Sequence, residues 1–246
     1  MKKLRLGMLT PSSNTVLEPV TVAMLAGLPE VTAHFSRFPV TEISLSRDAL
    51  AQFDTAPMLA AAALLAHARV DAIAWNGTSA AWLGFDRDEA LVARIREATG
   101  IPACTSMLAY RPIFAATGAR RIGFVTPYLG QVQERILGNF ARLGYECAAE
   151  RHLDVSENFA FATISDAAIA EMTRAVAAEK PDAIVIICTN MAGAPLVDRL
   201  ERETGIPIYD SIATAVWSSL LAAGMAPARV QGWGRLFTDP RLQSLG

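Results

Sequence analysis

The segment DAIVIICTNMAG, Asp182–Gly193, places a thiol at the end of an apolar run. The run continues to Ile187, Cys188 follows it, and Thr189 and Asn190 then add a hydroxyl and an amide. A thiol in such a setting can serve as a general acid, a general base or a nucleophile. The alternative is inert core followed by a helix cap, which is the commoner fate of a single cysteine at a strand end.

Three pairs of similar segments occur in the same order along the chain, which indicates a duplicated unit. LGMLTP resembles IGFVTP at an offset of 122 − 6 = 116, and DAIAWNGTS resembles DAIVIICTN at 182 − 71 = 111. REATGIPACTS resembles ERETGIPIYDS at 201 − 96 = 105. Chance similarity between apolar strands explains one pair, but three pairs in order favour duplication. The duplication places Gly77 opposite Cys188, and Thr78 opposite Thr189.

Polar loops follow the first strand of each repeat, at TPSSN (Thr10–Asn14) and TPYLG (Thr126–Gly130). Hydroxyl and amide groups are therefore expected to gather around Gly77 and Cys188. The group comprises Ser12, Ser13, Asn14, Thr78, Ser79, Tyr128, Thr189 and Asn190. Together with exposed backbone N–H groups at helix N-termini, these donors favour an anion. Such a cleft suits a carboxylate or an enolate, and it predicts a site without a metal.

The elements that position these residues alternate between short apolar runs and helical patterns. The expected strands are Leu4–Leu9, Val31–Ser36, Val70–Trp75, Arg121–Thr126, Asp182–Cys188 and Ile206–Tyr209. The expected helices are Asp48–Ala68, Arg87–Ala98, Gln131–Leu143, Asp166–Glu179 and Pro195–Glu203. This alternation predicts an α/β fold of two pseudo-symmetric lobes, each a mainly parallel sheet flanked by helices. Because ligands of such sheets lie beyond the carboxyl ends of the strands, the active-site cleft is expected between the lobes.

The offsets of the repeat also predict the lobe limits. Residues 1–115 are expected to form lobe 1 and residues 116–216 to form lobe 2, with the C-terminal segment 217–246 packing back on lobe 1. Trp75 and Trp82 flank the Gly77 turn, and packing roles are expected for both. Cys104 and Cys147 are expected to be structural, because neither has a mirrored polar group around it.

Composition and charge exclude several classes of protein. The net charge is −2 and no basic cluster is present, which argues against nucleic acid as a partner. The alanine-rich run Met58–Ala68 is too short to span a membrane. No secretory pattern follows the first residues, and the 3 cysteines are not closely paired, so a reduced, cytoplasmic protein is expected. Scattered histidines and the absence of CxxC, HExxH, GxGxxG and P-loop motifs predict neither a metal nor a nucleotide cofactor.

Over nearly its whole length the chain resembles the maleate isomerase and arylmalonate decarboxylase family of the aspartate/glutamate racemase superfamily. PSSNTVLEP is similar to the N-terminal signature of maleate isomerases, whose asparagine, here Asn14, contacts a substrate carboxylate. The active-site tyrosine of the family matches Tyr128, an asparagine of its middle segment matches Asn158, and its second-lobe catalytic cysteine matches Cys188. The GTS of arylmalonate decarboxylases, part of their carboxylate-stabilising hole, matches Gly77–Ser79. RRIGFVTPY and GWGRLF also look like that group.

One position separates the members of this superfamily. Its racemases and maleate isomerases carry a cysteine in each lobe, and Gly77 stands where the first would be. Arylmalonate decarboxylases share the arrangement of this chain, with glycine in the first lobe and cysteine in the second. The resemblance therefore implies a cofactor-free carboxy-lyase that decarboxylates a substituted malonate through an enediolate, which Cys188 protonates. A decarboxylase needs this thiol neutral, whereas an isomerase or racemase needs a thiolate.

Two alternatives stay open from the sequence. One is a maleate cis–trans isomerase or an Asp/Glu/hydantoin-type racemase, and the other is a non-catalytic protein that binds small carboxylates. SSNT and CTN replace the proline- and alanine-rich loop and the CGG of the decarboxylases, so a polar group or a second carboxylate is expected on the substrate. The expected substrate-binding residues are Asn14, Ser13, Thr78, Ser79, Asn158, Thr189 and Asn190. A homodimer is the expected assembly, because related enzymes often assemble.

Overall fold

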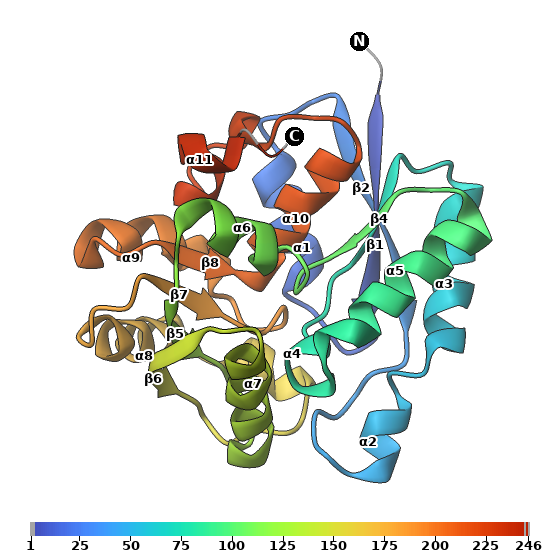
Figure 1. The fold of residues 1–246 in the computed structure, drawn as a ribbon. Coiled ribbons are helices and arrows are strands. Elements are labelled where there is room, and N and C mark those ends of the chain that lie inside the picture. The colour runs from blue at the N-terminus through green and yellow to red at the C-terminus, as the bar shows by residue number, and fades with distance from the viewer. Residues whose placement is uncertain (1–2, 244, 246) are drawn as a thin grey trace.

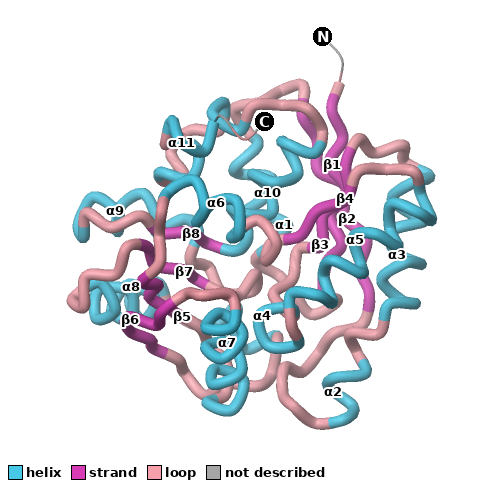
Figure 2. Tube along the Cα trace, in the orientation of Figure 1, coloured by secondary structure: helices cyan, strands magenta, loops and turns pink. Residues whose placement is uncertain are grey.

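The structure, a computed structural model, describes residues 3–243 and 245 and contains two four-stranded sheets (Figure 1). The strand order is β2–β1–β3–β4 in the first sheet and β6–β5–β7–β8 in the second, and neighbouring strands are parallel. Helices pack around both sheets (Figure 2). The predicted α/β fold of two lobes, each a parallel sheet flanked by helices, is confirmed.

The strands of the two sheets match the predicted apolar runs, with two additions. Their bounds are β1 Leu4–Pro11, β2 Val31–Phe38, β3 Ala72–Trp75, β4 Ala103–Thr105, β5 Arg121–Val125, β6 Glu146–Arg151, β7 Ala183–Ile186 and β8 Ile208–Asp210. Every residue of β3 and β7 is buried, which explains their continuous apolar character. The sequence missed β6, an edge strand with polar ends, and gave no range for β4, which has three residues.

Helices occupy all the predicted helical ranges, with outer ends within two residues of the prediction, and one range is divided between α2 and α3. Their bounds are α1 Leu17–Leu25, α2 Arg47–Ala51, α3 Thr55–His67, α4 Ala80–Leu83, α5 Phe85–Thr99, α6 Tyr110–Thr117, α7 Gly130–Arg142, α8 Asp166–Ala177, α9 Val197–Thr204, α10 Ser211–Ala222 and α11 Pro240–Gln243. The helices α1, α4, α6, α10 and α11 lie outside the predicted ranges. In α10, every residue from Ser211 to Leu220 is buried, so the sequence lacks the polar face that marks an amphipathic helix.

One stretch of the described chain, residues 47–67, is long and apolar enough to cross a membrane by length and composition alone. The structure divides it into α2 and α3, because helical geometry is interrupted between Gln52 and Asp54. α3 packs against β1, β2 and α5 of the first lobe. Its buried residues Met58, Ala61, Ala62 and Leu65 follow the spacing of one helix face, so that face is used within the fold.

Two helices cross between the lobes. α10 follows β8 of the second sheet, yet it packs on β3 and β4 of the first. α6 follows β4 of the first sheet, and its Tyr110 hydroxyl donates a hydrogen bond to the Tyr209 carbonyl oxygen of β8 at 3.1 Å. The predicted lobe limits at residues 115 and 216 fall within these two helices. The division of the chain at those limits stays a prediction.

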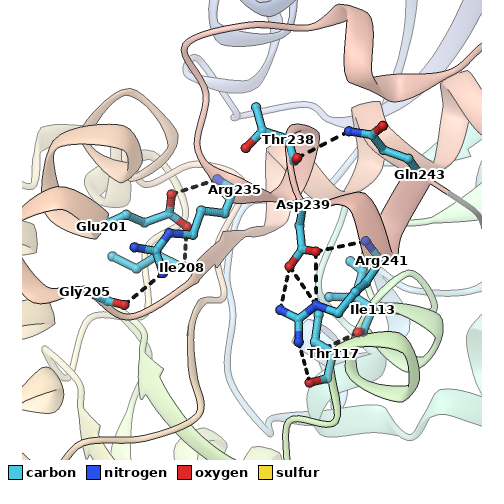
Figure 3. A network of polar contacts seen from close by, with 10 residues as sticks. All are labelled: Ile113, Thr117, Glu201, Gly205, Ile208, Arg235, Thr238, Asp239, Arg241 and Gln243. Atoms are coloured by element: carbon cyan, nitrogen blue, oxygen red, sulfur yellow. Dashed lines mark hydrogen bonds and ion pairs between the residues drawn. The ribbon is translucent and has the colours of Figure 1, made fainter.

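Polar contacts hold the C-terminal segment against the rest of the molecule (Figure 3). The Glu201 carboxylate in α9 accepts a hydrogen bond from the Arg235 backbone N–H at 2.7 Å. The Arg241 guanidinium pairs with Asp239 and donates to the Thr117 carbonyl oxygen at 3.1 Å. These contacts connect the end of the described chain to α9 of the second lobe and to the crossing helix α6.

Candidate active site

Gly77 and Cys188 follow equivalent central strands, β3 and β7, and lie at their carboxyl ends. A cavity of about 20 Å³ lies between the two turns and is lined from both lobes. Eight of the predicted site residues line it: Gly77, Thr78, Ser79, Tyr128, Asn158, Cys188, Thr189 and Asn190. The structure therefore brings these residues together at the position where parallel sheets bind ligands.

The indole of Trp75 fills the space beside Gly77. A Cβ atom placed on Gly77 would lie 2.0 Å from Cζ2 and 2.3 Å from Cη2 of that indole. Phe38 packs against the same indole, with ring centroids 5.2 Å apart. Because interiors are closely packed, a cysteine cannot stand at Gly77 unless Trp75 moves or is replaced. The position mirrored to the thiol is thus occupied by an aromatic ring.

Cys188 is deeply buried, with 2% of its surface exposed. Burial raises the pKa of its thiol to about 12, although hydrogen bonding to the Asn190 and Met191 backbone N–H groups and to Tyr128 lowers it in part. The Cys188 backbone N–H donates to Ser211 Oγ at 3.2 Å, which fixes the start of the turn. The side chain is therefore a neutral thiol at pH 7, the state that a general acid requires.

Tyr128 connects the thiol to the first-lobe turn. Its hydroxyl shares a hydrogen bond of 2.7 Å with Thr78 Oγ1. Burial and the neighbouring Cys188 raise the pKa of the phenol well above its ordinary value, so the hydroxyl stays protonated. Edge contacts with Trp82 and Phe161, at centroid distances of 5.2 and 5.4 Å, hold the ring in place. This pair of hydroxyls can stabilise negative charge that develops in the cavity.

Amide side chains join the two lobes at the same place. Asn14 Nδ2 donates to Thr189 Oγ1 at 3.1 Å, and Thr189 Oγ1 donates to the Asn76 carbonyl oxygen at 3.2 Å. Asn190 Oδ1 accepts a hydrogen bond from the Thr15 backbone N–H at 2.9 Å. These three bonds span the cleft, so they fix the distance between the two turns.

Ser12, Ser13 and Asn14 belong to the predicted polar group but do not line the cavity. Ser13 Oγ donates to the Val40 carbonyl oxygen at 2.6 Å and accepts from Asn158 Nδ2 at 2.8 Å. Asn14 Oδ1 accepts from the Val16 and Leu17 backbone N–H groups at 3.0 and 2.9 Å and so orders the turn that leads into α1. The Ser13 and Asn14 side chains brace the site through protein groups, and direct contact with a substrate stays a prediction for each.

A short loop after β2 closes the cavity against the second lobe. The Ile43 backbone N–H donates to the Ser156 carbonyl oxygen at 2.8 Å, and the Asn158 backbone N–H donates to the Thr41 carbonyl oxygen at 2.9 Å. Val40 and Ile43 supply apolar wall. A cavity of this size holds roughly one water molecule.

A larger cavity of about 300 Å³ adjoins the first and shares Phe53 and Ser79 with it. Arg47, Arg87 and the buried Asp88 also line it. Its lining contains no thiol, so the chemistry is assigned to the smaller cavity despite its size. Over residues 3–243 and 245, no group of three or more His, Cys, Asp or Glu side chains is placed to hold a metal ion.

The sequence predicts packing roles for Trp75 and Trp82, yet both line the cavity beside the thiol. The repeat contained the available signal for Trp75, because it pairs Trp75 with Ile186 at the offset of 186 − 75 = 111. Trp75 stands two positions before Gly77, and the smaller Ile186 stands two positions before Cys188. This difference in side-chain volume indicates that the two strand ends are packed differently. Ser211, which holds the Cys188 backbone, was also missed.

Fold and site together define a two-lobed α/β protein with a neutral thiol and several hydroxyl donors at the cleft between the lobes. The sequence profile of the arylmalonate decarboxylase family matches residues 18–237. The match covers most of the chain, so this protein belongs to the arylmalonate decarboxylase family. The resemblance noted in the sequence is thereby confirmed.

Individual relatives include both enzymes of the predicted family. Arylmalonate decarboxylase of Bordetella bronchiseptica is 32% identical over 153 residues, which is 61% of this chain and 63% of that enzyme. A maleate isomerase of Pseudomonas putida is 29% identical over 248 residues, covering 95% of this chain and 97% of that enzyme. The structure of a cysteine-to-alanine variant of maleate isomerase from Pseudomonas putida S16 with maleate is similar at a TM-score of 0.88 and 27% identity, covering 98% of this chain and 100% of that one. The chain is therefore a member of an enzyme family.

Proposed function

We propose that this protein is a cofactor-independent decarboxylase of a small substituted malonate, with Cys188 as its single proton donor. One observation carries the proposal: a thiol follows β7, whereas Gly77 covered by the Trp75 indole follows β3. Racemisation by two acids needs a proton carrier on each face of the substrate, and the cavity offers one thiol on one face. The raised thiol pKa of about 12 favours the same reaction, because it keeps the proton on sulfur.

In the proposed reaction, the bond between the α-carbon and one carboxylate breaks, and that carboxylate leaves as carbon dioxide. The electron pair of the bond passes to the remaining carboxylate and forms an enediolate. Thr78, Ser79, Tyr128 and the backbone N–H groups after Gly77 and Cys188 donate hydrogen bonds to its oxygens, each worth roughly 2.7–4 kcal/mol by analogy with other oxyanion donors. The Cys188 thiol transfers its proton to the α-carbon, and water then returns a proton to the sulfur.

The substituent on the malonate is polar or small in this proposal. Asn190 and Thr189 add polar groups to a cavity lining that also contains aromatic rings, and the cavity itself holds only about 20 Å³. The adjoining cavity, which has room for a substituent, is lined by polar side chains such as Arg47 and by apolar side chains such as Met58.

Maleate isomerase is the second candidate, and the match along nearly the full length of the Pseudomonas putida enzyme supports it. Isomerisation by addition of a thiol to the double bond needs a thiolate. The burial of Cys188 makes that state scarce at neutral pH. A racemase is less well supported, because the first-lobe turn has Gly77 where a second thiol would be needed. A non-catalytic carboxylate binder would leave the neutral thiol without a role.

The test is turnover of methyl-, phenyl- and hydroxymalonate and of maleate, followed by NMR in deuterated water. We expect carbon dioxide release from at least one malonate and a single deuterium at the α-carbon of its product. Cys188→Ala should lower the rate of this reaction by about 10³-fold, and Cys147→Ala, at an exposed cysteine, should leave it unchanged as the matched control. Conversion of maleate to fumarate without any malonate decarboxylation would assign the isomerase function instead. A cytoplasmic location, a homodimer and the absence of nucleic-acid and membrane partners stay predictions.

A further inference from the structure

Two tryptophans that line the catalytic cavity have buried indole N–H groups without an acceptor among the described residues. Trp75 Nε1 and Trp82 Nε1 are buried, and neither has a hydrogen-bond partner within the described residues. Trp75 is 0% exposed and Trp82 is 3% exposed. Both residues line the cavity that also holds Cys188 and Tyr128. A buried donor without a partner costs about 1–3 kcal/mol, so a pair of them at one small cavity calls for a functional explanation.

Aromatic contacts hold both indoles in fixed orientations. Phe38 packs against Trp75 at a centroid distance of 5.2 Å and an angle of 46°. Trp82 lies edge-on to Phe53 at 5.8 Å and to Tyr128 at 5.2 Å. Donors that are already oriented stabilise a developing anion without reorganising, which is the property that an oxyanion site requires.

The position of Trp75 places its N–H beside the first-lobe turn. Its Cε2 atom, which is bonded to Nε1, lies 2.5 Å from the point where a Cβ on Gly77 would stand. Trp82 approaches from α4 and contacts Tyr128, whose hydroxyl is bonded to Thr78. The two indoles and the two hydroxyls therefore surround the same small space.

An indole N–H can only donate, so its partner must be an acceptor. We propose that Trp75 and Trp82 form a carboxylate-binding pair, whose N–H groups donate to the oxygens of the carboxylate that the substrate retains. This inference rests on the proposed function, since those oxygens gain charge as the enediolate forms. It assigns Trp75 two roles: its ring excludes a thiol from the first-lobe face, and its N–H holds the substrate against Cys188.

Replacing each N–H by a sulfur atom, through incorporation of 3-benzothienylalanine at position 75 or 82, removes the donor and keeps the ring system. We expect kcat for the malonate to fall by about 10²–10³-fold at each position, as for the loss of one oxyanion donor. The thermal midpoint should not fall, because no bond within the protein is broken. The same replacement at the half-buried Trp233 is the control. Unchanged kcat at both positions would overturn the inference.

Binding can be observed without turnover in ¹⁵N-labelled Cys188→Ala protein titrated with methylmalonate and, separately, with maleate. The indole N–H signals, assigned from Trp75→Phe and Trp82→Phe, should move downfield for these two residues, while the Trp233 signal stays in place. If either anion shifts backbone signals around the cavity but leaves both indole signals unchanged, this inference is wrong and the proposed function stands. If neither anion shifts any signal, the proposed function fails and the inference fails with it.

Discussion

The ends of β3 and β7 are built from the same repeat but are packed in opposite ways. Trp75 and Gly77 in the first lobe correspond to Ile186 and Cys188 in the second, at offsets of 186 − 75 = 111 and 188 − 77 = 111. In the first lobe the large side chain comes two residues earlier and covers a glycine. In the second lobe a smaller side chain leaves room for a thiol. The sizes of the side chains at positions 75 and 77, compared with those at positions 186 and 188, therefore decide which face of the cleft carries the thiol.

The neighbouring strand ends differ in charge as well as in volume. Thr105 ends β4, and its hydroxyl oxygen accepts from the Leu108 backbone N–H at 3.0 Å. Asp210 ends β8 at the equivalent position, 210 − 105 = 105, and its Oδ1 accepts from the Ile212 backbone N–H at 2.7 Å. Both side chains cap the turn that follows, but Asp210 adds a buried carboxyl group near Cys188, whose charge raises the thiol pKa further. The second lobe thus favours the protonated thiol through burial and charge together.

Removing the Cys188 thiol should have the largest effect on the reaction. Cys188 is the one cysteine in the cavity lining, so the variant loses the proton donor of the proposed mechanism. We expect Cys188→Ala to lower kcat for malonate decarboxylation by about 10³-fold, within the range for loss of a general acid. Steady-state rates of carbon dioxide release measure this directly. Equal rates for Cys188→Ala and the parent protein would remove the thiol from the reaction.

Removing one hydroxyl of the cleft should have the next largest effect. Tyr128→Phe and Thr78→Val each delete a donor of the 2.7 Å pair, and we expect kcat to fall by about 10²-fold in each. Tyr145→Phe, at a tyrosine packed among Phe114 and Phe140 away from the cavity lining, is the matched control. A rise in KM without a change in kcat would show that the pair only binds the ground state.

Converting the first strand end into a copy of the second sharpens the comparison. Gly77→Cys alone should lower the free energy of unfolding by about 1–3 kcal/mol, because the new side chain overlaps the Trp75 indole. Adding Trp75→Ile should restore stability and place a thiol on both faces. With a malonate that carries two different substituents, the double variant should then release product with reduced enantiomeric purity, as measured by chiral chromatography. If Gly77→Cys alone is as stable as the parent in urea, the packing explanation is wrong.

The buried carboxyl of Asp210 should make stability depend on pH in a defined direction. Burial raises its pKa from 3.8 to about 7, so between these values the folded protein holds a proton that the unfolded chain has released. The stability contribution is therefore full below about pH 4 and lost as pH rises toward 7.

Asp210→Asn should keep the hydrogen bond from the Ile212 backbone N–H and should remove the loss of stability at higher pH. Its unfolding free energy relative to the parent should increase between pH 5 and pH 8 by at most about 3 kcal/mol, because the loss runs over about two pH units from pH 5 to the folded pKa of about 7, at about 1.36 kcal/mol per unit. Urea denaturation at both values measures the change, and Asp48→Asn on the exposed face of α2 is the control. A difference that does not vary with pH would show that Asp210 is ionised in the folded state throughout.

Most of the fold could be predicted because burial on both faces gives β3 and β7 unbroken apolar runs. α10 could not, since a helix buried all round has no amphipathic period. The crossing of α6 and α10 depends on contacts between segments far apart in sequence, such as Tyr110 with Tyr209. The candidate site followed from the repeat, which pairs Gly77 with Cys188. The indole beside Gly77 did not, because side-chain volume in the cleft is set by three-dimensional packing.

Protonation from one face is tested most directly by turnover of a malonate with two different substituents in deuterated water. One thiol on one face predicts a product with a single deuterium at the α-carbon and one enantiomer in large excess. A racemic product from the parent protein, or the same enantiomeric excess in Cys188→Ala at an undiminished rate, would contradict it.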